Sequence, residues 1–183
     1  MITIDELRAL NAHVTYNPLG VVKLRVNYDE FWHFYSDKTP VALEDNIHSH
    51  PYTYESKILF GGLRHHIYDV IPVEKSHQRY DARFGISNKT PITTLHENVE
   101  PVKLTSFDTY KDDSYYIKHS TLHKIEVITP KCVTYLKAEP WVKQLFFVVD
   151  KDNVYTRKDI AQRATTDECW EIIEYTLNDE DNC

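Results

Sequence analysis

Short segments in which apolar and polar residues alternate follow one another through the middle of the chain. Ten of them are rich in valine, isoleucine, tyrosine, phenylalanine and threonine. Closely spaced segments of this kind predict an antiparallel β-sandwich or β-barrel. The ten predicted strands are Val21–Tyr28, Phe31–Tyr35, Ile47–His50, Ser56–Phe60, Leu63–Val70, Val102–Phe107, Ser114–Lys118, Thr121–Ile128, Cys132–Leu136 and Leu145–Val149.

Both ends of the chain carry the signals of a short helix. Thr3 and Glu6 have the spacing of a capping box, in which the threonine side chain and the glutamate side chain each bond the other's backbone. Thr165 and Glu168 repeat that spacing near the other end, and apolar residues then recur at helical intervals. The sequence therefore predicts a mainly β domain with short flanking α-helices.

Two features interrupt the strand pattern. Gly61-Gly62 separates two apolar runs and predicts a two-residue hairpin turn. Residues 72–101 are polar and proline-containing, and we expect them to form a long excursion from the sheet.

Composition narrows the class of protein. The chain has 183 residues, enough for one domain with a real core, and glycine is scarce at 4. No glycine-rich phosphate-binding motif occurs. The net charge of -7 arises entirely from the acidic C-terminal segment after Arg163, and the rest of the chain is balanced. We therefore expect no general binding to nucleic acid or to an anionic membrane.

Neither the termini nor the cysteines suggest an extracellular protein. No apolar run approaches the roughly 18–20 residues of a membrane helix, and the first ten residues lack the basic start of a secretory signal. The three cysteines, Cys132, Cys169 and Cys183, are widely spaced and are predicted to be free thiols. A cytoplasmic location is the expectation.

The candidate chemistry centres on His48-Ser49-His50. Residues i and i+2 of a strand point to the same face, so His48 and His50 can present two imidazoles to one point. Glu55 begins the next apolar run and is predicted to return a carboxylate to that point. Imidazoles with a carboxylate suit a divalent transition metal, with iron preferred and manganese, nickel, copper or zinc also compatible. The HxHx4E pattern is expected roughly 0.04 times by chance in this composition.

These residues resemble the first motif of the cupin superfamily, G(X)5HXH(X)3–4E(X)6G. Here it reads His48, His50, Glu55 and Gly62, with Ala42 in place of the leading glycine. Of the second motif only the histidine is retained, at His123, which follows one predicted strand and opens another. His119, four residues earlier, is an alternative to it.

The resemblance implies a single-domain antiparallel jelly-roll β-barrel over residues 20–150. Residues 1–19 would form an N-terminal extension and residues 151–183 an acidic helical segment. By this resemblance the metal ligands are His48, His50, Glu55 and His123, and the excursion at 72–101 lies near the barrel mouth. Cupins also commonly form homodimers, which makes a homodimer an expectation by analogy.

Further residues lie near this motif in sequence. Glu55 and Tyr116 are candidate catalytic groups, and inward-facing cations there would anchor a substrate carboxylate or phosphate. Only one of His65 and His66 can face inward, because adjacent strand residues point to opposite faces. The candidate substrate-binding residues are Tyr52, Lys57, Arg64 and His65.

Three functions remain open at this point. The first is an Fe(II)-type dioxygenase that acts on a small polar metabolite. The chain is loosely similar to thiol dioxygenases of the cupin class, but these typically lack the glutamate that is present here as Glu55, so a thiol substrate is not implied. The second is a metal-dependent isomerase or hydrolase of a sugar or nucleotide. The third is a non-catalytic pocket that sequesters a small ligand.

Overall fold

The fold is defined by a computed structural model that describes residues 2–17, 20–39, 47–83, 92–142, 144–150 and 165–178. Within these residues the chain forms two helices and eleven strands. The elements are α1 (Ile4–Ala9), β1 (His13–Asn17), β2 (Val21–Arg25), β3 (Glu30–Ser36), β4 (Ile47–His48), β5 (Tyr54–Phe60), β6 (Gly62–Arg83), β7 (Ile92–Tyr110), β8 (Ser114–Ile117), β9 (Leu122–Val127), β10 (Lys131–Ala138), β11 (Gln144–Asp150) and α2 (Thr166–Leu177).

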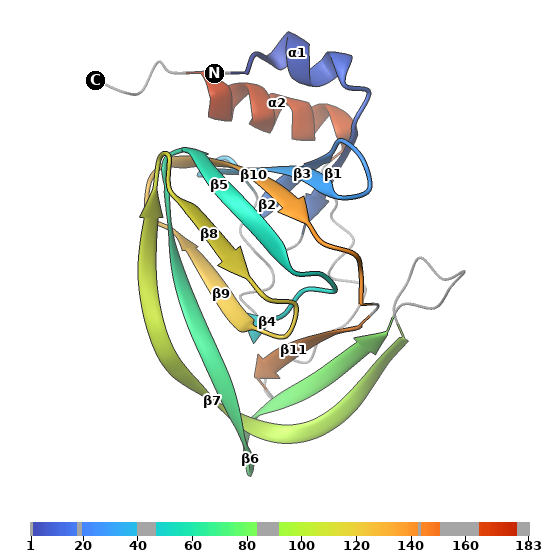
Figure 1. Cartoon of the computed structure of the whole chain (residues 1–183), viewed down its shortest axis with the longest axis vertical. Coiled ribbons are helices and arrows are strands. Elements are labelled where there is room, and N and C mark those ends of the chain that lie inside the picture. Colours follow the sequence, from blue (N-terminus) through green and yellow to red (C-terminus); the bar gives the residue numbers. More distant parts are fainter. Residues whose placement is uncertain are drawn as a thin grey trace.

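The strands form two antiparallel sheets (Figure 1). The first has six strands in the order β1-β2-β3-β10-β5-β8, and the second has five in the order β11-β4-β9-β6-β7. β6 is long enough to pair twice on one edge: residues 63–68 pair with β9, and residues 77–83 pair with β11. β11 also pairs with β4, and β4 pairs with β9. The four strands β11, β4, β9 and β6 therefore form a closed ring of pairings within the second sheet.

The mainly β prediction is confirmed, and each of the ten predicted strands overlaps an observed one. The strand that the sequence pattern missed is β1. Both predicted helices are present, and Thr3 and Thr165 each form the expected capping box. The two helices span six and twelve residues, and no helix among the described residues is long and apolar enough to cross a membrane.

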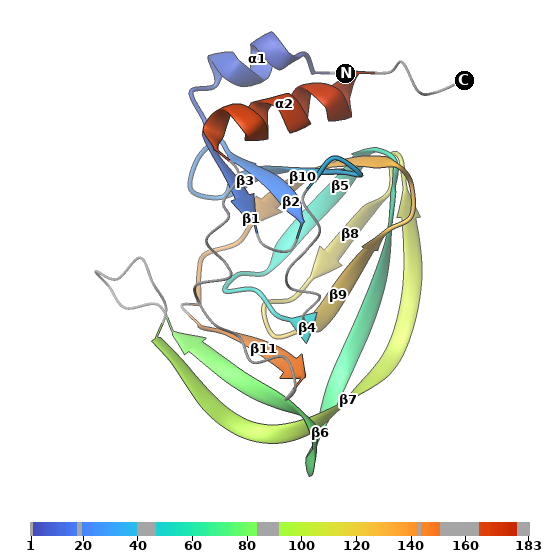
Figure 2. The ribbon, with the colours of Figure 1, turned by 180° about the vertical axis from the view of Figure 1, so that it is seen from behind.

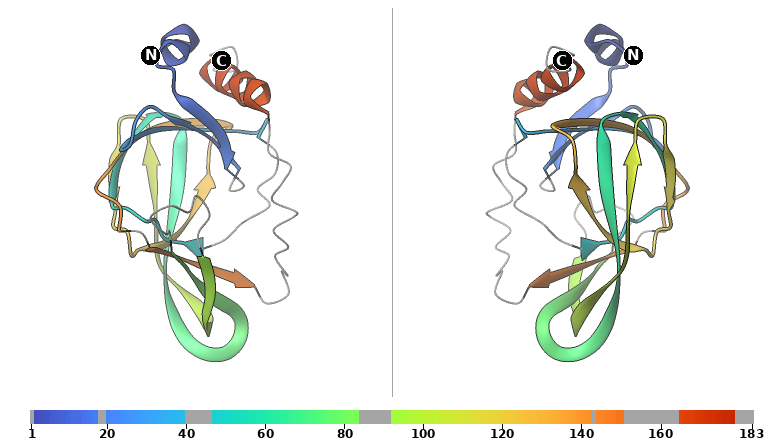
Figure 3. Two further views of the ribbon diagram at one scale, coloured as in Figure 1. Left: turned by 90° about the vertical axis from the view of Figure 1, so that its right-hand side faces the viewer. Right: turned by 90° about the vertical axis from the view of Figure 1, so that its left-hand side faces the viewer.

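Strands β2, β3 and β10 of the first sheet are largely buried on both faces, which explains why they are apolar at both parities, whereas β5 and β8 are exposed on one face. On β2, Val22 and Leu24 pack with the helices, which lie against the outer side of this sheet (Figures 2 and 3). Val21, on the opposite face, packs into the space between the two sheets. That inner core is rich in aromatic residues, and most of its members come from the first sheet: Val21, Phe31, Tyr35, Tyr52, Tyr54, Ile58, Leu63, Tyr115, Ile117, Cys132, Leu136 and Ala138.

Gly61-Gly62 does not close a hairpin, contrary to the prediction. It carries the chain from β5 in the first sheet to β6 in the second. Gly61 has a φ of +75°, and a Cβ atom there would lie 2.0 Å from the carbonyl oxygen of Lys131. This close approach of two backbones, and not a tight hairpin, is the reason for the glycine.

Residues 72–101 are not a loop excursion either. Their described part consists of the distal halves of β6 and β7, which form a curved hairpin at the end opposite the helices (Figure 1). A register shift between Pro72 and His77 accommodates the proline, since an irregular position does not need its missing N–H. Polarity misled the prediction because this hairpin extends away from the main core.

Lys131 ties the C-terminal helix to the sheet, and its replacement by methionine tests that attachment. The buried ammonium donates to the carbonyl oxygen of Asn178 (2.9 Å) and lies 4.2 Å from the centre of the Tyr175 ring. We expect Lys131→Met to lower the free energy of unfolding by about 2–3 kcal/mol in urea denaturation. Lys38, an exposed lysine 5.3 Å from the same ring, is the matched control, and Lys38→Met should cost about 0.5 kcal/mol or less. Equal losses in both variants would contradict this role.

Candidate metal centre

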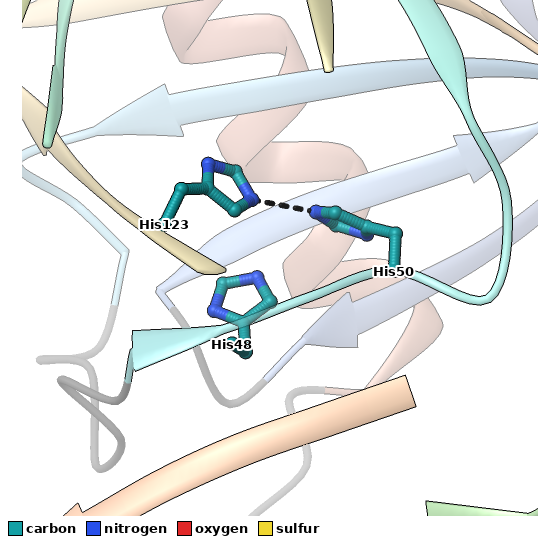
Figure 4. A group of neighbouring side chains, drawn as sticks. All are labelled: His48, His50 and His123. Carbon is teal, nitrogen blue, oxygen red and sulfur yellow. Dashed lines mark hydrogen bonds between the residues drawn. The ribbon is translucent and has the colours of Figure 1, made fainter. Parts of the chain in front are cut away.

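Three histidines converge in the second sheet. His48 ends β4, a two-residue strand that lies between β11 and β9, where it pairs with Phe147 on one side and His123 on the other. His123 lies on β9 and also pairs with Ile67 of β6. His50 follows β4 in extended chain, two residues after His48, so all three imidazoles reach the same point (Figure 4).

The geometry of the three rings suits a metal ion. Their centroids form a nearly equilateral triangle with sides of 5.0, 4.9 and 5.0 Å. One ligand nitrogen from each ring can be chosen so that all three lie within 4.8 Å of one another, and the Nε2 atoms of His50 and His123 are 2.8 Å apart. Nitrogens bound to one metal at about 2.1 Å lie about 3.0–3.4 Å apart, which is close to the separation of His50 and His123, whereas the 4.8 Å limit for the set requires the rings to draw closer on binding.

Burial keeps two of these imidazoles neutral. Desolvation lowers the pKa of His50 and of His123 well below the ordinary value, and the neighbouring histidines lower both further. A metal binds the neutral imidazole, so these two side chains are ready to bind without losing a proton at neutral pH. The donor set therefore fits a divalent transition metal of the kind that prefers imidazole.

The surroundings of the triad are aromatic. The rings of Tyr52 and Tyr54 lie 5.5 and 4.9 Å from that of His50. Burial raises the pKa of Tyr52 to about 12 and that of Tyr54 well above its ordinary value, so both phenols keep their protons.

The Nδ1 atom of His123 is buried and has no hydrogen-bond partner within the described chain. A metal-binding histidine usually has such a partner at its second nitrogen, whereas His123 is held by packing, by strand pairing and by the contact of its Nε2 atom with His50.

Glu55 does not join the triad, which corrects the predicted ligand set. It lies on β5 between Tyr54 and Ser56, whose side chains are buried, and its own side chain is exposed. Because strand residues alternate between faces, the carboxylate points away from the core. The described structure therefore brings together three of the four predicted ligands, His48, His50 and His123, and leaves Glu55 on the outer face of β5.

Three other candidates also lie on outward faces. The Tyr116 side chain is exposed and donates to Glu139 (3.1 Å). Lys57 pairs with Asp112 at 3.4 Å, and Arg64 forms a two-pronged pair with Asp108 at 2.7 and 2.9 Å. These contacts place Tyr116, Lys57 and Arg64 away from the triad.

Tyr52 and His65 do face inward. His65 is fully buried, accepts or donates at Nε2 with the Thr109 hydroxyl (3.1 Å), and stacks on Phe107. Burial lowers the pKa of His65 to about 4. Its neighbour His66 contacts Ser106 and Glu126 on the outer side, as the parity argument predicted. His119, the alternative to His123, is exposed beside Thr53.

Sequence reasoning missed three interior groups. Lys23 and His33 pair across β2 and β3 on the face that carries Val21, and Tyr115 lies on β8 with its ring 4.2 Å from that of His65. The available signal was parity: Lys23 shares the inner face of β2 with Val21, although lysine is rarely placed inside.

Comparisons with known proteins add little to this picture. No protein-family model and no curated protein matches the sequence. A chain of the crystal structure of Drosophila melanogaster CENP-C bound to CAL1 aligns with 73% of this chain and 89% of its own length. The identity is 9% and the TM-score 0.39, which is too low to assign a shared fold.

Substitution of the triad tests the ligand set. We expect His48→Ala and His123→Ala each to weaken Zn²⁺ binding, measured by calorimetry, by more than about 100-fold. Loss of a hydrogen-bond partner of a ligand costs roughly 10- to 100-fold, and loss of the ligand itself should cost more. Glu55→Gln should bind Zn²⁺ as the unchanged protein does, because its side chain is exposed. A large loss in Glu55→Gln would restore the carboxylate to the site and refute the arrangement described above.

His33 gives a prediction of pH dependence that does not involve the triad. Burial, together with the charge of Lys23, lowers the pKa of His33 to about 3. Between pH 6.5 and 4 the unfolded chain therefore binds a proton that the folded chain does not, and stability falls as the pH falls, by about 1.4 kcal/mol per pH unit. We expect His33→Gln to reduce the slope of unfolding free energy against pH by about this amount in urea titrations. The same substitution at His13, which is exposed on β1, is the matched control for the loss of an imidazole.

Proposed function

We propose that this protein is a metal-dependent enzyme with a cupin-type jelly roll, and that it is an Fe(II)-type dioxygenase of a small polar metabolite. The observation that carries the proposal is the convergence of His48, His50 and His123 into one triangle between strands of the second sheet. The jelly roll is supported by two antiparallel sheets that share an aromatic core. His48 lies on β4 and His123 on β9, which is the order of the first and second cupin motifs along the chain.

Three neutral imidazoles leave the charge of a bound ion uncompensated. His48, His50 and His123 would hold the metal from one side, and a metal held in this way supplies open positions for dioxygen and substrate. The protein itself supplies the aromatic surroundings, because Tyr52 and Tyr54 pack beside His50.

The two acid–base candidates of the sequence analysis do not lie beside the triad, which favours oxygenase chemistry over hydrolysis or isomerisation. A hydrolase or isomerase needs a residue that gives or takes a proton close to the substrate. Glu55 and Tyr116, the candidates for that work, point outward, and no aspartate or glutamate of the described residues is fully buried, although the Oδ1 atom of Asp81 on β6 is. The interior phenols hold their protons too tightly to act as bases at neutral pH.

Thiol dioxygenases of the cupin class typically lack the glutamate that is present here as Glu55. Because Glu55 lies outside the triad, this difference does not affect the proposed metal ligands. The ligand set proposed here is three histidines without a carboxylate. This set alone does not select a substrate, and the substrate class is argued below from a separate group of residues.

Oxygen consumption tests the proposal. We expect protein loaded anaerobically with Fe(II) to consume dioxygen when supplied with a panel of small polar metabolites that includes carboxylates, amino acids and sugar phosphates. His48→Ala should abolish the consumption and Glu55→Gln should retain it, because only the first residue belongs to the triad. Turnover of a panel compound without dioxygen uptake, with zinc or manganese bound, would replace this function by the isomerase or hydrolase alternative.

A further inference from the structure

Two cations lie on the inner face of β2 without an acidic partner. Lys23 and Arg25 are two residues apart on this strand, so both point toward the side that carries Phe31. Within the described ranges, neither forms a salt bridge with an aspartate or glutamate. Like charges this close repel each other, and their arrangement needs a negative group to offset it.

The ammonium of Lys23 is enclosed by rings. It lies 3.8 Å from the centre of the Phe31 ring and donates to the hydroxyl oxygen of Tyr52 (3.2 Å). An ammonium has three N–H donors, and the structure gives one of them an acceptor in the described chain. Burial and the charge of Arg25 lower the pKa of Lys23 to about 8, which shows how poorly its charge is compensated.

Arg25 lies next to it on the strand. Its guanidinium stacks 5.7 Å from the Phe31 ring and 5.3 Å from the Tyr28 ring, and its Nε donates to the carbonyl oxygen of Asn27 (2.9 Å). The hydrogen bond uses Nε, and within the described residues the two terminal nitrogens have no hydrogen-bond acceptor. A guanidinium in this state is suited to a two-pronged contact with a carboxylate or phosphate.

This pair of cations adjoins the triad. Tyr52 connects them: its hydroxyl accepts from Lys23, and its ring lies 5.5 Å from the ring of His50. A small molecule that contacts Lys23 therefore lies beside the three histidines.

We propose that Lys23 and Arg25 form an anion-binding subsite that receives a carboxylate or phosphate group of the small-molecule substrate of the three-histidine site. That the bound anion belongs to a substrate rests on the function proposed above. The subsite itself is formed by β2 and Tyr52 and does not require a metal. It takes the role that the sequence pattern assigned to Lys57 and Arg64, which are paired with acids on outer faces.

Calorimetric titration of metal-free protein with inorganic phosphate and, separately, with acetate tests the subsite. We expect one of the two anions to bind, and Lys23→Met to weaken its binding by about tenfold or more, the loss typical of a charge-assisted hydrogen bond. Lys23→Arg should keep most of the affinity. The stronger anion distinguishes a phosphate-bearing substrate class from a carboxylate-bearing one.

Lys57→Met and Arg64→Met are the matched controls, since each removes one positive charge from an outer face. Both should bind the anion like the unchanged protein. Equal affinity in Lys23→Met and Lys57→Met, or no binding of either anion by the unchanged protein, would overturn the proposal.

Stability separates a binding role from a structural one. Methionine keeps the apolar stem and removes a poorly compensated charge, so Lys23→Met should unfold at the same or a higher urea concentration. A clear loss of stability with unchanged anion affinity would show that Lys23 serves packing only. Zn²⁺ titration of the same variant keeps the two proposals apart: Lys23→Met should bind zinc normally. Anion binding without zinc binding in the unchanged protein would retain the subsite and reject the metal enzyme.

Discussion

The site depends on the pairing of a two-residue strand from both sides. β4 is held between β9 and β11, and the backbone after it remains bonded: Ser49 donates to the carbonyl oxygen of Phe146 (2.8 Å), and Phe146 donates to the Ser49 hydroxyl (2.8 Å). Without these partners the segment from 47 to 50 would be a loop. The double pairing of β6 closes the ring of strands that supports it, so the position of three imidazoles follows from strand register.

The inner core is filled by rings that carry polar atoms but no charge. Burial moves the pKa of His50 and His123 downward and that of Tyr54 and Tyr115 upward, and in both cases the neutral form is favoured. Such a core can pack like an apolar one and still offer nitrogen ligands. Lys23 is the exception. Desolvation lowers its pKa to about 8, so its ammonium group is still mostly protonated at neutral pH.

Alternation along strands could be predicted from the sequence, and it accounts for both the success and the error at the site. It brought His48 and His50 to one point, and it required that only one of His65 and His66 face inward, as the structure shows for His65. Applied to the run from Tyr52 to Ile58, it would also have placed Glu55 and Lys57 outside, since Tyr54 and Ser56 between them are buried. Long-range pairing could not be predicted: no local pattern shows that β5 and β6 belong to different sheets, or that β6 bends to pair twice.

The absence of Glu55 from the triad changes what the interior requires of a ligand. A carboxylate ligand would have offset part of the charge of a divalent ion, whereas three imidazoles offset none. Lys23 and Arg25 add positive charge on β2 of the first sheet, and no aspartate or glutamate of the described chain is fully buried, although the Oδ1 atom of Asp81 on β6 is. Negative charge must then come from outside the inner core, and a small anion that contacts both the histidines and β2 is the simplest source of it.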